Sequence, residues 1–103
     1  MKPLIEPKAC DNIEEIRDSI DLIDQEILHL FAKRLEYVKE IVKFKIADEE
    51  AIIARERREV VLNQRKEWAE EKGLDPELME KVFKLLIDKN IQIQLDIYKS
   101  NSK

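Results

Sequence analysis

Arg34 interrupts an isoleucine repeat, and its position suggests chemistry rather than packing. Steps of seven residues along the chain reach Ile13, Ile20, Ile27, Arg34 and Ile41. An arginine is seldom buried without a partner. Lys45 follows Arg34 by eleven residues, about 20° further around a helix of 3.6 residues per turn, so both cations would share one face. Such a face is typical of an anion site.

Two amides interrupt another apolar pattern nearer the C-terminus. Asn90 and Gln94 are four residues apart, so they would lie on one side of a helix. Taken singly, these residues have structural interpretations: the cations could reach solvent or pair with carboxylates, and Asn90 could fix helix register. Together, cations and uncharged amides in a helical core predict a pocket for a small dianion, because arginine binds carboxylates bidentately while lysine and glutamine donate to other oxygens.

Arg17 does not fit the same face. It precedes Arg34 by seventeen residues, which places it about 100° away around the helix. If Arg17 serves a site at all, a site of a different chain is plausible.

Three helices, long, short and long, are expected to position these residues. The apolar spacing and the helix signals predict helices over about 12–46, 54–72 and 76–99, with a loop at 47–52 and a disordered tail, KSNSK. The first helix, roughly 50 Å long at 1.5 Å per residue, is longer than so short a chain can cover by itself. It therefore predicts a partner, most simply a second copy.

Capping residues fix the expected helix ends. Asp11 or Asn12 is the predicted N-cap of the first helix, and Glu14 follows Asp11 at capping-box spacing. Gly73 is the natural C′ residue of the second helix. Asp75 then serves as the N-cap of the third, followed by a proline at its first position.

The composition favours a single all-α domain over residues 1–103. The chain is 41% charged and 44% apolar, with one glycine and three prolines, too few turn residues for a sheet protein. One histidine and one cysteine cannot build a zinc site or a disulfide, and one glycine excludes a glycine-rich phosphate loop. We therefore expect neither a metal nor a cofactor.

The net charge of −4 provides no general attraction for nucleic acid or an anionic membrane, so an anionic ligand must be held by a local cluster of cations. No apolar run approaches the roughly 20 residues of a spanning helix, and the N-terminus lacks the apolar core of a signal peptide. We expect a cytoplasmic protein that binds neither nucleic acid nor membrane.

The residues that carry the anion-site pattern resemble the all-α, or type II, chorismate mutase family. Arg17 and Arg34 in IRDSIDLIDQEILHLFAKR, Lys45 in KFK and Gln94 match that family in residue type and order, over roughly residues 10–98. Three local runs are more similar to its isochorismate-pyruvate lyase branch: Cys10 seven residues before Arg17, YVK with FK ahead of the loop, and WAEEKGLD after it.

This resemblance implies an intertwined homodimer of three-helix subunits with two equivalent sites. Arg17 would reach the partner's site, while Arg34, Lys45 and Gln94 would belong to their own subunit's site. The arginines would hold chorismate, a dianion, in its reactive conformer. Lys45 and Gln94 would stabilise the charge that develops on its ether oxygen during rearrangement to prephenate.

The segment after the loop is less well matched. Arg55 and Glu56 resemble the family's pair for one carboxylate and the ring hydroxyl, but the loop differs in length from both branches, so Arg57 could occupy that place instead. Arg57 and Arg58 otherwise fit a solvated helix face. Asn90 stands where mutases often carry a small hydroxyl residue, which leaves substrate preference open.

Chorismate mutase is the favoured function. The alternative is an isochorismate-pyruvate lyase that produces salicylate and pyruvate in the same pocket, because the predicted ligand residues do not separate the two. A non-enzymatic dimeric helical adaptor is a more distant hypothesis. Nucleic-acid binding through residues 55–65 is disfavoured by the acidic net charge.

Overall fold

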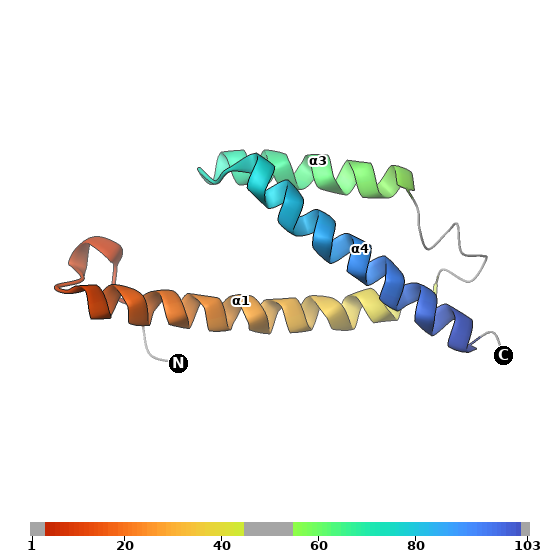
Figure 1. Ribbon diagram of the computed structural model, residues 1–103, viewed down its shortest axis with the longest axis horizontal. Helices are drawn as coiled ribbons and strands as arrows, with labels where there is room; N and C mark the ends of the chain where they lie inside the picture. Colours follow the sequence, from red (N-terminus) through yellow and green to blue (C-terminus); the bar gives the residue numbers. More distant parts are fainter. Residues whose placement is uncertain (1–3, 45–54, 102–103) are drawn as a thin grey trace. The chain divides into compact units, whose positions relative to one another are not determined.

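The computed structural model describes residues 4–44 and 55–101, and the side chains of the second range from residue 57 onward. The regular elements within these residues are all helices. A short 3-10 helix, η1 (Pro7–Ala9), precedes α1 (Ile13–Ile41), α3 (Arg55–Glu71) and α4 (Pro76–Asn101) (Figure 1). The α-helices contain 29, 17 and 26 residues, and no strand occurs in the described ranges. The predicted all-α order of long, short and long is confirmed. Contacts divide the chain into two compact units, Met1–Glu36 and Tyr37–Lys103.

Asn12 caps the start of α1, as one of the two predicted N-caps. The Glu15 amide donates to Asn12 Oδ1 at 2.9 Å, and the Asp11 amide donates to Glu15 Oε2 at 3.1 Å. The carboxylate that accepts an amide ahead of the helix is therefore that of Glu15, and the predicted role of Glu14 was wrong: its carboxylate pairs instead with Arg17 at 3.2 Å. The carboxylates of Glu14 and Glu15 in the first turn also interact favourably with the positive end of the helix dipole.

The end of α1 lies earlier than predicted. The helix stops at Ile41, and the Lys43 and Phe44 amides donate to Glu40 and Ile41 carbonyls at 3.1 and 2.9 Å. Bonds to the third preceding residue tighten the chain into a turn over 42–44. Residues 45 and 46 of the predicted helix lie outside the described residues.

A glycine turn joins α3 to α4. Gly73 has a φ of 74°, a left-handed conformation that glycine adopts without a Cβ penalty. Its amide donates to the Glu70 carbonyl at 3.0 Å, and the Leu74 amide donates to the Ala69 carbonyl at 2.8 Å. These two bonds form a Schellman motif, and the predicted C′ role of Gly73 is confirmed.

The start of α4 also follows the prediction. Asp75 Oδ1 accepts hydrogen bonds from the Glu77 and Leu78 amides at 3.0 and 3.4 Å, with proline at the first helical position. At the other end, α4 continues through Asn101. The predicted disorder of the tail was therefore wrong for residues 99–101, and residues 102–103 lie outside the described part.

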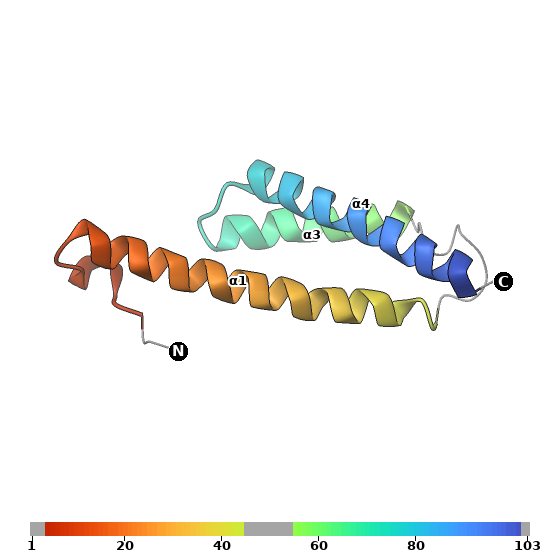
Figure 2. The same cartoon turned by 60° about the horizontal axis from the view of Figure 1, so that its bottom comes forward.

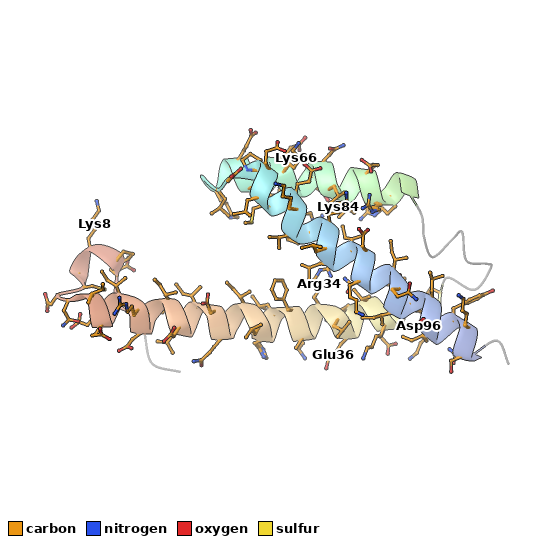
Figure 3. All side chains as sticks on the ribbon, in the orientation of Figure 1. Lys8, Arg34, Glu36, Lys66, Lys84 and Asp96 are labelled. Atoms are coloured by element: carbon orange, nitrogen blue, oxygen red, sulfur yellow. The ribbon has the colours of Figure 1, made fainter. Side chains whose placement is uncertain are left out.

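Helices α3 and α4 lie side by side in both views (Figures 1 and 2). Leu62 and Ala69 of α3 are each 4% exposed. Lys66 Nζ lies 3.3 Å from Glu77 Oε1 and 3.2 Å from Glu80 Oε2, close to the turn (Figure 3). Hydrogen bonds to Glu80 and Glu77 raise the pKa of Lys66. The helix pair is thus held by apolar contact and by ion pairs.

The apolar face of α1 in the unit Met1–Glu36 is largely exposed. Its side chains are between 41% and 57% exposed at Ile13, Ile16, Ile20, Ile23, Ile27 and Leu30. The segment from Leu4 to Cys10 adds an apolar recess of about 450 Å³ against Ile16, Ile20 and Ile23. None of the described helices combines the length and apolar character needed to cross a membrane.

Candidate functional site

Gln94 is a buried hydrogen-bond donor on α4, with 4% of its surface exposed. Its Nε2 donates to the main-chain carbonyl of Val38, near the end of α1, at 2.9 Å. Val38 and Val42 are also buried, at 8% and 6% exposed. Sequence reasoning selected Gln94 but missed Val38, because a main-chain acceptor leaves no signature in residue type.

Asn90 lies one helical turn before Gln94 on α4. Its Nδ2 is buried and has no hydrogen-bond partner among the described residues. An unsatisfied buried donor costs about 1–3 kcal/mol, so this group favours a ligand that supplies an acceptor. The structure therefore brings two predicted site residues, Asn90 and Gln94, to one side of one helix.

Arg34 projects from α1 and is partly buried (Figure 3). Burial lowers the pKa of its guanidinium, because the charged form loses water. Its neighbour Lys33 pairs with Glu36 at 3.5 Å, and no carboxylate of the described part of Met1–Glu36 pairs with Arg34. A partly desolvated cation of this kind is suited to a carboxylate ligand.

Arg17 and Arg34 are far apart along the same helix. Seventeen residues at 1.5 Å per residue separate them by about 25 Å, more than one small dianion spans. Arg17 pairs with Glu14, and their side chains are 63% and 71% exposed. Because exposed ion pairs contribute little, this contact does not prevent Arg17 from taking another partner.

The remaining predicted site residues lie in or beside the segment outside the described residues. Lys45 itself lies outside them. Since α1 ends at Ile41, the angular argument that placed Lys45 on the face of Arg34 no longer applies. Arg55 is the first residue of α3, but its side chain and that of Glu56 are not among those described; Arg57 is exposed. Their roles stay predictions.

Arg58 is partly buried, although it was expected to lie on a solvated helix face. Its side chain is 20% exposed, and its Nε and Nη2 lie 3.0 and 2.9 Å from Asp88 Oδ1 on α4. Arg58 therefore joins α3 to α4. The sequence held no signal for this pair, because the two residues are 30 positions apart and belong to different helices.

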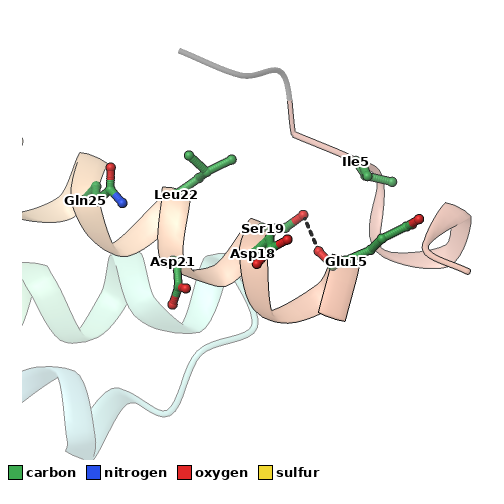
Figure 4. A pocket seen from close by; sticks show the side chains of 7 residues that line it. All are labelled: Ile5, Glu15, Asp18, Ser19, Asp21, Leu22 and Gln25. Atoms are coloured by element: carbon green, nitrogen blue, oxygen red, sulfur yellow. Dashed lines mark hydrogen bonds between the residues drawn. The ribbon is translucent and has the colours of Figure 1, made fainter. Parts of the chain in front are cut away.

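A recess of about 430 Å³ lies along the first turns of α1 (Figure 4). Its lining consists of Ile5, Glu15, Asp18, Ser19, Asp21, Leu22 and Gln25. Ser19 Oγ donates to the Glu15 carbonyl at 2.9 Å. Three carboxylates repel a dianion, so this recess does not suit the predicted ligand. In the residues the structure describes, no three His, Cys, Asp or Glu side chains are grouped as metal ligands would be.

These features define an all-α protein with buried amide donors and a partly buried arginine. The sequence model of the chorismate mutase type II family matches residues 16–95 of the chain. This range includes Arg17, Arg34, Lys45, Asn90 and Gln94. The chain belongs to this family of enzymes.

The relatives that are similar to the chain include a lyase and two T-proteins. Isochorismate pyruvate lyase of Pseudomonas aeruginosa is 39% identical over 93 residues, 90% of this chain and 91% of the relative. The T-proteins of Haemophilus influenzae and Enterobacter agglomerans are 38% and 39% identical over 70% and 67% of this chain. The chain spans only 19% and 18% of those two proteins, but about nine-tenths of the lyase.

Proposed function

We propose that the chain is a chorismate mutase, a single domain that converts chorismate to prephenate in the cytoplasm. The observation that carries the proposal is the pair of buried amides on α4, Asn90 and Gln94, within the segment that matches the family. Uncharged donors in a helical core are expensive to bury without an acceptor. Asn90 Nδ2 has no acceptor among the described residues, and Gln94 Nε2 has a second hydrogen beside the one it donates to Val38. Both amides therefore suit a ligand whose oxygens carry or develop negative charge.

The rearrangement needs restraint and electrostatic stabilisation rather than a nucleophile. The C–O bond of the enolpyruvyl ether breaks as a C–C bond forms, within one cyclic transition state. In this proposal Arg34 and an Arg17 bind the two carboxylates and hold the compact reactive conformer. Lys45 and Gln94 donate to the ether oxygen as its negative charge grows.

Three further residues belong to the proposed binding set. Asn90 would donate its unpartnered Nδ2 to a carboxylate oxygen. Arg55 and Glu56 would hold one carboxylate and the ring hydroxyl, with Arg57 as the alternative to Arg55. No metal or cofactor has a part in this scheme.

A homodimer is part of the same proposal. The exposed isoleucines of α1 require an apolar cover, and moving one such side chain from half exposed to buried contributes roughly 1 kcal/mol. Arg17 and Arg34 are too far apart to bind one ligand within a chain, so an Arg17 from the partner would complete each site. Dimer formation would then both cover the apolar face and assemble the ligand contacts.

The second candidate is isochorismate-pyruvate lyase activity. It is favoured by the identity of 39% to a relative of that name, which is matched over nearly its whole length. In that reaction a hydrogen of the ring moves to the enolpyruvyl carbon while the same C–O bond breaks, and salicylate and pyruvate are released. The same cations and amides would serve, because the charge again develops on the ether oxygen.

Purified protein incubated separately with chorismate and isochorismate tests both candidates. Loss of substrate absorbance in the ultraviolet follows turnover, and salicylate fluorescence reports the lyase. Prephenate from chorismate without salicylate from isochorismate supports the mutase, and rapid salicylate release supports the lyase. If neither substrate reacts and neither raises the melting temperature, the dimeric adaptor becomes the better hypothesis.

A further inference from the structure

We infer that the main-chain carbonyl of Val38 positions the Gln94 amide for the reaction, so that the last turns of α1 orient a donor on α4. The inference rests on the function proposed above. Its geometric basis is the 2.9 Å hydrogen bond from Gln94 Nε2 to Val38 O, which joins residues 56 positions apart. Val38 is therefore a positioning residue that acts through Gln94.

The Val38 contact determines which end of the Gln94 amide faces α1. A carbonyl oxygen only accepts hydrogen bonds, so the nitrogen of the amide must lie against it. A flipped amide would place its oxygen against the Val38 oxygen, and Gln94 is too buried, at 4% exposed, for water to relieve that contact. The planar NH2 group has a second hydrogen, whose direction is then fixed as well. That hydrogen is the one available to a substrate oxygen.

The acceptor itself is held firmly. The Val38 side chain is buried near the end of α1, the Val42 side chain is buried in the turn that follows, and the Lys43 and Phe44 amides donate within that turn. Asn90, one turn earlier on α4, provides a contrast within the same helix, because its Nδ2 has no partner among the described residues. Gln94 is thus preorganised before ligand arrives, which is the condition under which a donor stabilises a transition state effectively.

Gln94→Glu tests the contact through the pH dependence of stability. A carboxyl group can occupy this place only as an O–H donor to Val38, so its folded-state pKa is raised above the unfolded value of about 4.3. The stability that the protonated carboxyl group contributes is fully present below the unfolded pKa, and it is lost as pH rises through the folded pKa. At a fixed protein concentration, we expect the variant to melt within about 3 °C of the parent at pH 4 and about 10 °C lower at pH 8.

Other ionisable groups on the three helices are common to parent and variant, so their titration cancels in the difference. Among them are Arg34 and Glu40 on α1, Arg58 of α3, which pairs with Asp88, and Tyr98 one turn after Gln94 on α4. Lys43, in the turn after α1, pairs with Glu40 at 2.7 Å. A cation that reached the introduced carboxylate would keep it ionised. The difference between variant and parent would then stay flat or reverse, which would overturn the inference.

Gln92→Glu is the matched control, two residues earlier on α4. Gln92 is exposed and donates to Asp96 at 2.9 Å, so its replacement should shift the melting temperature by no more than about 3 °C across the same pH range. Gln94→Met removes the donor without adding a titratable group, and its loss of stability should not depend on pH. If Gln94→Glu does not fold, side-chain hydrogen exchange in the parent decides: a Gln94 amide without protection contradicts the contact.

Activity separates positioning from a structural role. At a temperature where Gln94→Glu is folded, its kcat/KM for chorismate should fall about tenfold per pH unit above the raised pKa, while Gln92→Glu follows the parent. A pH-dependent stability with a pH-independent rate would overturn the positioning role. The melting series needs no substrate, so it tests the Val38 contact even if the proposed function fails. If the parent turns over substrate but the melting difference between Gln94→Glu and the parent does not change with pH, the Val38 contact alone is refuted.

Discussion

The α3–α4 pair and the first part of α1 differ in how far their side chains are buried and paired. In the pair, Leu62 and Ala69 are buried, Lys66 binds two carboxylates and Arg65 lies 4.5 Å from the Trp68 ring centroid. In Met1–Glu36, by contrast, the apolar face of α1 is about half exposed. The difference indicates that the helix pair is stabilised by its own contacts, whereas the apolar face of α1 lacks such cover, as the proposed dimer would require.

A charge placed on the apolar face of α1 tests whether this face is a dimer surface. Ile27→Lys should weaken dimer formation, because each copy loses apolar burial and gains a cation that must be desolvated. A cost of roughly 3 kcal/mol per copy, with two copies per dimer, raises the dissociation constant by about 10⁴. Sedimentation analysis over a dilution series measures this change.

Asp24→Asn provides the control for Ile27→Lys, since it adds the same unit of charge at an exposed polar position of α1. It should leave the dissociation constant within about threefold of the parent value. If Ile27→Lys and the parent associate equally well, the apolar face is not the dimer surface.

Lys45 lies in the sequence between the two regions, and it is proposed to touch the substrate. Lys45→Met removes a preorganised donor worth about 3–4 kcal/mol in the transition state, so kcat should fall by about two to three orders of magnitude. Steady-state kinetics with chorismate measures the effect. Lys43→Met is the matched control, because Lys43 is 70% exposed and pairs with Glu40; an equal loss in both variants would argue against the assigned role of Lys45.

Arg58 tests the claim that the helix pair is stabilised internally. Arg58→Met should lower the free energy of unfolding by about 1–2 kcal/mol, because it removes two charge-assisted contacts and leaves Asp88 without its partner. Arg57→Met, at the exposed neighbouring position, should change it by less than about 0.5 kcal/mol. Denaturant unfolding compares the two variants, and equal losses would show that the Asp88 contact is not the cause.

Three helix-capping residues could be predicted from the sequence, whereas the end of α1 and the long-range contacts could not. Asn12, Gly73 and Asp75 were identifiable because a cap depends on residue type within a few positions. The end of α1 was missed because the spacing of apolar residues continues past Ile41 and gives no stop signal. The two tertiary contacts, Arg58 with Asp88 and Gln94 with Val38, depend on how helices pack, which periodicity within one helix does not specify.

The same distinction applies to the candidate site. Arg34, Asn90 and Gln94 were recognisable as polar residues within apolar patterns, and the structure gives each a partly or fully buried environment. The role of Arg17 in the site of a second chain is suggested by its angular offset from Arg34 and by the family resemblance, and it stays a prediction. Main-chain acceptors such as the Val38 carbonyl cannot be identified from residue types, even where one is inferred to orient a site residue such as Gln94.

In the unmodified protein, we expect pH to have little effect on activity. Gln94 does not titrate, and although burial lowers the pKa of Arg34, an arginine remains protonated throughout the neutral range. Activity should therefore be nearly flat from about pH 6 to 8, changing by less than about threefold. Initial rates at constant ionic strength measure the profile. A steep loss of rate across this window would mean that a titrating group, rather than the Gln94 amide held by Val38, donates to the ether oxygen.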